Sequence, residues 1–64
     1  MRRIVWVVTV GNAAWAVCDN KETAIDRAPI FNDDAWVIVS GNYQYAFNRG
    51  GVRVSVACLD VDDR

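Results

Sequence analysis

The chain has 64 residues, of which 53% are hydrophobic and 23% charged, and its formal net charge at pH 7 is −1. A chain of this length forms a single domain with a small core, and its apolar content is too high for a disordered segment. The near balance of 7 basic and 8 acidic residues argues against a surface that binds polyanions through charge alone.

The residues that most enzymes need are missing. The chain contains no histidine, and Lys21 and Glu22 are its only lysine and its only glutamate. The commonest general base and the commonest metal ligand are therefore absent. Cys18 and Cys58 belong to no Cys-x-x-Cys pair and are expected to be buried apolar side chains, with a disulfide only if the protein is exported. The sequence predicts a protein without catalytic activity, metal or cofactor.

The beginning of the chain has some features of a secretory signal, because Arg2 and Arg3 precede an apolar run from Ile4 to Val10. That run is short, however, and the turn pair Gly11-Asn12 ends it. No apolar stretch approaches the ~20 residues that cross a membrane as a helix. We therefore expect a strand here and a cytoplasmic protein that contacts no membrane.

A first hairpin is expected over about residues 3–18, with a type II′ or I′ turn at Gly11-Asn12. This turn predicts that Val10 pairs with Ala13, Val8 with Trp15 and Trp6 with Val17. One face of the hairpin would then carry large side chains. The other face would carry mostly small ones, namely Val5, Val7, Thr9, Ala14, Ala16 and Cys18.

A helix of about two turns is expected over about residues 20–28. Asp19 is the predicted N-cap, with Glu22 completing a capping box, and Pro29 ends the helix. We expect its apolar side to pack on the small-residue face of the hairpin. The connection that follows should be anchored to the core by Ile30 and Phe31.

A three-stranded meander is expected over about residues 35–59, with strands at 35–40, 43–47 and 52–59. An even-residue loop over residues 48–51 would put the valines of the last strand on the same face as Trp36, Ile38, Tyr43, Tyr45 and Phe47. The acidic end of the chain is expected to be frayed. The predicted fold is a single α+β domain over residues 1–64, a small antiparallel sheet with one short helix in the order β-β-α-β-β-β.

Twelve residues are candidates for partner binding. The aromatic candidates serve either as core or as a protein-binding or dimer face, and the acidic candidates either as a rim that docks on a basic partner or as solvated surface. The acidic runs lack the spacing of a calcium loop. The candidates are Trp6, Trp15, Trp36, Tyr43, Tyr45, Arg49, Arg53, Asp33, Asp34, Asp60, Asp62 and Asp63.

The function predicted by elimination is binding to a larger host protein or complex. Small inhibitors made by phages and mobile elements against defence nucleases or polymerase have this size and this lack of catalytic residues, which is an analogy with such anti-defence proteins. One alternative is a homodimer that assembles only with itself. A second is a single-strand nucleic-acid binder that uses Tyr43, Tyr45, Phe47 and Arg53, which the low basic charge disfavours.

Overall fold

The computed structural model describes residues 2–31 and 33–62 and contains one α-helix, one short 3-10 helix and five strands. The predicted α+β fold and its β-β-α-β-β-β order are confirmed. The elements in chain order are β1 (Arg2–Val10), β2 (Ala13–Cys18), α1 (Lys21–Arg27), η1 (Asp33–Ala35), β3 (Val37–Ser40), β4 (Tyr43–Phe47) and β5 (Arg53–Asp62).

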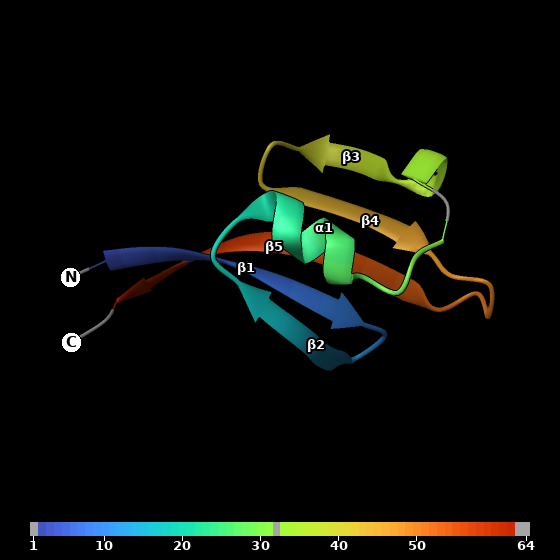
Figure 1. Ribbon diagram of the computed structural model, residues 1–64, viewed down its shortest axis with the longest axis horizontal. Coiled ribbons are helices and arrows are strands. Elements are labelled where there is room, and N and C mark those ends of the chain that lie inside the picture. The colour runs from blue at the N-terminus through green and yellow to red at the C-terminus, as the bar shows by residue number, and fades with distance from the viewer. Residues whose placement is uncertain (1, 32, 63–64) are drawn as a thin grey trace.

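The five strands form one antiparallel sheet in the order β2-β1-β5-β4-β3 (Figure 1). β5 lies in the middle and joins the first hairpin to the second. Its pairing with β1 runs from Val10 opposite Val54 to Arg2 opposite Asp62. β5 thus includes residues 60–62, which were expected to be frayed. Beyond β2 and β4, β1 and β5 continue as a two-stranded ribbon, with the two ends of the chain at its tip.

The N-cap of α1 is Asn20 and not Asp19 as predicted. The Asn20 side-chain oxygen accepts a hydrogen bond from the Thr23 backbone N–H at 2.8 Å, which satisfies one of the free donors of the first turn. At the other end, Ala28 is extended because the ring of Pro29 disfavours helical backbone in the residue before it. α1 therefore has only seven residues.

The core lies between α1 and one face of the sheet. Val8, Val54 and Val56 are 0% exposed on that face, and Ala24 and Ala28 of the helix segment pack over them. Small helix residues allow the helix to approach the sheet closely. Other side chains that pack against this cluster while remaining partly exposed are Trp6, Val10, Ala16, Ile25, Ile30 and Trp36.

The predicted register of the first hairpin is wrong beyond the turn. Gly11 has a φ of +60°, and no described non-glycine residue, Asn12 included, has a positive φ. A positive φ at the first central residue alone is typical of a type II′ turn. Val10 pairs with Ala13 as expected, but a β-bulge shifts the register, so that Val8 pairs with Ala16. Ala16 and Cys18 therefore share the face of Trp6 and Val8, and α1 covers this face instead of the face of Val5 and Val7.

The predicted register between the last two strands is also wrong. The Asn48 N–H donates to the Val52 carbonyl at 3.0 Å, which leaves a three-residue loop that closes with Gly51 at a φ of +75°. Because the number of loop residues is odd and not even as expected, the alternate side chains of β5 lie on the opposite faces from those predicted. Phe47 pairs with Arg53, so Tyr43, Tyr45 and Phe47 lie on the face opposite the buried valines.

Candidate protein-binding face

The sheet face opposite α1 is here called the open face. Figure 1 shows α1 in front of the sheet, and the helix contacts β1, β2 and β5 from that side. Alternation along paired strands defines the residues on the other side. They are Arg3, Val5, Val7 and Thr9 of β1, Ala14 and Val17 of β2, Val37 and Ser40 of β3, Tyr43, Tyr45 and Phe47 of β4, and Arg53, Ser55, Ala57, Leu59 and Val61 of β5.

Most of the large aliphatic side chains on the open face remain in contact with solvent. Val17 is 64% exposed, Leu59 50% and Val37 47%, while Val5 is buried. The valines under the helix, by comparison, are fully buried. Several exposed large apolar side chains on one face of a sheet are uncommon on proteins that act alone.

A row of three rings crosses the open face along β4. Residues two apart in a strand point to the same side, so Tyr43, Tyr45 and Phe47 are neighbours. The Tyr43 and Tyr45 ring centroids are 6.2 Å apart with a tilt of 39°, and the Tyr45 and Phe47 centroids are 5.9 Å apart in an edge-to-face arrangement. Both centroid distances lie in the range of interacting aromatic pairs, and the edge-to-face arrangement of Tyr45 and Phe47 is one of the favoured geometries.

Arg53 is held over this row. Its guanidinium carbon lies 4.4 Å from the centroid of the Tyr45 ring and 5.9 Å from that of Tyr43, and its Nη2 donates a hydrogen bond to the Tyr43 hydroxyl. The cation–π contacts and the hydrogen bond restrict a side chain that would otherwise be mobile. The structure therefore presents a fixed positive charge beside three rings.

The charges of the described residues are divided between the two sides of the molecule. The open face carries Arg3 and Arg53 and no carboxylate. Glu22 and Asp26 belong to α1, on the other side of the sheet, and Asp60 pairs with Ile4 on the helix side of the ribbon. Among the described residues, the open face therefore presents arginines and no acidic side chain.

The structure divides the predicted aromatic set between the two faces. Trp6 and Trp36 pack against the core, and Lys21 Nζ lies 5.9 Å from the centroid of the Trp6 ring. Trp15 is 56% exposed, and its indole N–H donates to the Arg27 carbonyl at 3.0 Å, so it links β2 to the end of the helix. Of the predicted residues, only Tyr43, Tyr45 and Arg53 come together, and Phe47 joins them.

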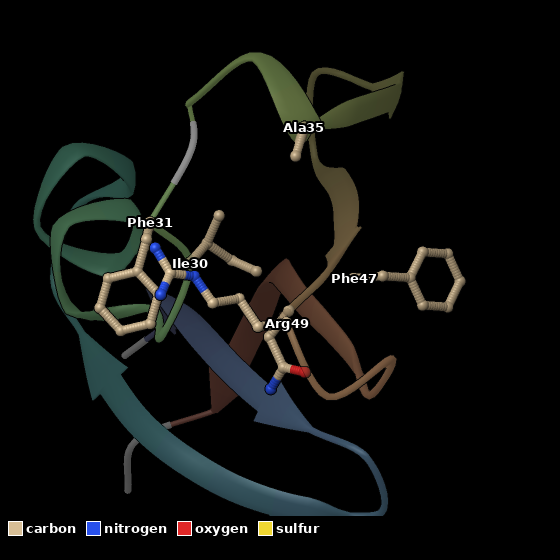
Figure 2. A pocket seen from close by; sticks show the side chains of 6 residues that line it. Ile30, Phe31, Ala35, Phe47 and Arg49 are labelled. Atoms are coloured by element: carbon tan, nitrogen blue, oxygen red, sulfur yellow. The ribbon is translucent and has the colours of Figure 1, made fainter.

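Arg49 lies apart from this group, at a pocket of about 290 Å³ beside the η1 segment (Figure 2). Its guanidinium carbon is 5.4 Å from the centroid of the Phe31 ring. Both Ile30 and Phe31 were predicted to anchor this segment to the core. Ile30 does pack against the core, but Phe31 is 79% exposed and does not. Phe47 also lines this pocket, although its ring points away from the other labelled side chains in Figure 2.

The predicted acidic residues do not form one patch. Asp33 and Asp34 lie in η1, before β3, whereas Asp60 and Asp62 lie on the β1–β5 ribbon at the opposite end of the sheet (Figure 1). Asp63 lies outside the described residues. The described residues contain no cluster of His, Cys, Asp or Glu that could hold a metal ion.

Sequence reasoning missed the aliphatic half of the open face. Val5 and Val7 were assigned to the face beneath the helix, and Val17 and Leu59 were not proposed as binding residues. Their alternation is visible in the sequence, but which of the two sides the helix covers depends on the bulge at β2 and on the odd loop before β5.

Comparison of the chain with protein-family models, curated proteins and solved structures gave no match. In the part of the chain that the structure describes, no helix is long and apolar enough to cross a bilayer. The residues of the open face are therefore the observations that bear on function.

Proposed function

We propose that this protein is a non-catalytic binding domain and that its open face binds a partner protein. The observation that carries the proposal is the row of Tyr43, Tyr45 and Phe47 on the same face as Val17, Leu59 and Val37, which are about half exposed or more. Burying such side chains is the main source of affinity between proteins.

The dimensions of the molecule agree with a protein partner. Its two longest extents, 39 and 21 Å, enclose a rectangle on the order of 800 Å², close to the area that one partner contributes to a specific interface. Tyrosine and arginine are the residue types that most often dominate binding energy at interfaces. Arg53 and its ring neighbours have the composition of such a centre.

The charge on this face supports a partner with carboxylates around an apolar contact area. Arg3 and Arg53 would pair with them, and no acidic side chain among the described residues of the open face would repel them. Inhibition of a larger host complex in the cytoplasm, as by proteins of phages and mobile elements, is the more specific form of this proposal. Its basis is an analogy of composition, because the chain has no histidine and only one lysine and one glutamate.

A single-stranded nucleic acid is the competing partner, because rings and an arginine on a sheet face are the elements that bind unpaired bases. Two features favour a protein instead. Arg53 already lies over the Tyr45 ring, where a base would have to stack, and the face offers only two arginines among many aliphatic side chains.

The test uses two open-face variants and a matched control. Val17→Asp and Leu59→Asp place a charge on the open face, whereas Ile4→Asp changes an aliphatic residue of similar exposure, 59%, on the other face. A tagged protein captures its partner from lysate of the source cells, and the purified partner is then titrated by calorimetry. We expect both open-face variants to weaken binding by about tenfold or more and the control to bind as the unchanged protein does.

Unchanged affinity in both open-face variants would overturn the proposal, as would an equal loss in the control. A titration with single-stranded oligonucleotides, followed by tryptophan fluorescence, separates the competing partner. Salt-sensitive binding that is lost in Tyr45→Ala would replace the protein by a nucleic acid.

A further inference from the structure

The two edges of the sheet differ in their protection. At β2, a bulge interrupts the register, and the Trp15 side chain is tied to the Arg27 carbonyl. At β3, all four residues are exposed, with Val37 at 47%, Ile38 at 67% and Val39 at 61%. No strand lies beyond β3 in the described sheet (Figure 1).

An outermost strand presents unpaired N–H and C=O groups. Proteins protect such an edge with a short strand or a β-bulge, and also with charged side chains or proline. β3 has the sequence Val-Ile-Val-Ser and contains neither. Its pairing with β4 is irregular between Ile38 and Ser40, which keeps the regular stretch short. A second strand that matches this edge would also be short and uncharged, with apolar side chains on both faces. β3 of another copy of the chain has these three properties.

We propose that β3 pairs in an antiparallel direction with β3 of a second copy of this chain, around a two-fold axis. Val-Ile-Val then meets Val-Ile-Val, and no like charges face each other across the pair. The nearest acidic residues, Asp33 and Asp34, precede the strand. Antiparallel pairing puts these two acidic segments at opposite ends of the junction, whereas parallel pairing would bring them together.

This pairing has a geometric consequence for the open face. A two-fold axis perpendicular to the sheet extends five strands to ten and keeps both α1 helices on the same side. The two open faces then form one continuous surface. The dimer is independent of the proposed function, but where that function holds, the dimer is bivalent and gains avidity for a repeated partner.

The contact of four residues on each strand predicts a weak dimer. Edge pairing of this length buries much less than the ~800 Å² per partner of a stable interface. The dissociation constant should therefore lie in the micromolar range or above, and the monomer and dimer should exchange rapidly.

Sedimentation equilibrium from micromolar to millimolar concentration tests the pairing. We expect the mass to rise toward that of a dimer and the β3 amides to gain hydrogen-exchange protection with concentration. Ile38→Lys and Val39→Lys should weaken the dimer by at least about tenfold. Ile4→Lys, at a similarly exposed aliphatic position outside β3, should behave as the unchanged chain, and circular dichroism should show all variants folded.

Two results would overturn the inference. One is a monomer throughout the concentration range. The other is a dimer that survives Ile38→Lys but is lost in Leu59→Lys, which would place the second copy on the open face. Neither result depends on the partner protein, so this inference and the proposed function can fail separately.

Discussion

Asn20 is a clear example of one side chain that decides where an element begins. Both Asp19 and Asn20 are good N-cap residues, and the sequence favoured Asp19 because Glu22 follows it by three positions. In the structure, the Asn20 oxygen is the one that accepts the Thr23 N–H. A one-residue choice between two good caps is not decided by propensity alone.

The cap gives a prediction with a control in the neighbouring residue. Asn20→Ala should lower the free energy of unfolding by about 1 kcal/mol, because the Thr23 N–H loses its partner. Urea denaturation followed by circular dichroism measures this change. Asp19→Ala should change it by less than about 0.5 kcal/mol. Equal losses in both variants would show that Asp19 shares the cap.

The structure also fixes the positions of the two cysteines relative to each other. Cys18 and Cys58 both pair with Trp6, one from each side of β1, and both are free thiols. Two strand spacings separate their Cα atoms by about 10 Å, beyond the ~7 Å that a disulfide spans. A disulfide within one folded chain is therefore excluded by the strand order, which the sequence alone did not provide.

At the scale of elements, the sequence predicted where the strands and turns lie but not which way their side chains point. The Gly11-Asn12 and Gly41-Asn42 pairs mark both two-residue turns correctly. The faces depend on single residues. One bulged residue in β2 and the odd number of residues in the loop before β5 each exchange the sides of a strand.

The turns provide a second prediction. Gly51 has a φ of +75° and Gly41 does not have a positive φ, while a Cβ would meet nothing within 4 Å at either position. Gly51→Ala should therefore cost about 1–2 kcal/mol of stability through backbone strain alone. Gly41→Ala should be within about 0.5 kcal/mol of the unchanged protein. Thermal unfolding compares the two, and equal stability would contradict the strained turn.

For the whole molecule, the central position of β5 implies that neither hairpin folds by itself. β1 and β4 do not pair with each other, and each depends on β5 for its inner neighbour. A chain cut after Asn48 also loses Val54 and Val56 from the core. We expect that fragment to be unfolded, as measured by the dispersion of its amide NMR signals.

A peptide of residues 49–64 supplies the control for this prediction. Adding it to the fragment should restore the dispersed spectrum, because it carries the whole of β5. A fragment that unfolds cooperatively without the peptide would show that the first hairpin and α1 suffice for a stable core.

The candidate site illustrates the same limit at this scale. Tyr43, Tyr45 and Arg53 were identified from residue type, and the structure places them in one group. Val17 and Leu59 were missed, because their face becomes visible only when five strands are aligned at once. Long-range register is a property of the whole sheet and cannot be read from any one strand.

The nine-residue-pair ladder between β1 and β5 places Arg2 directly opposite Asp62. A short peptide linker between these positions would close the backbone into a circle without moving a strand. New ends could then be opened in the exposed Arg49–Gly51 loop, at the far end of the sheet. A circularly permuted chain would therefore form its strands in a different sequence order and still present the same sheet surface.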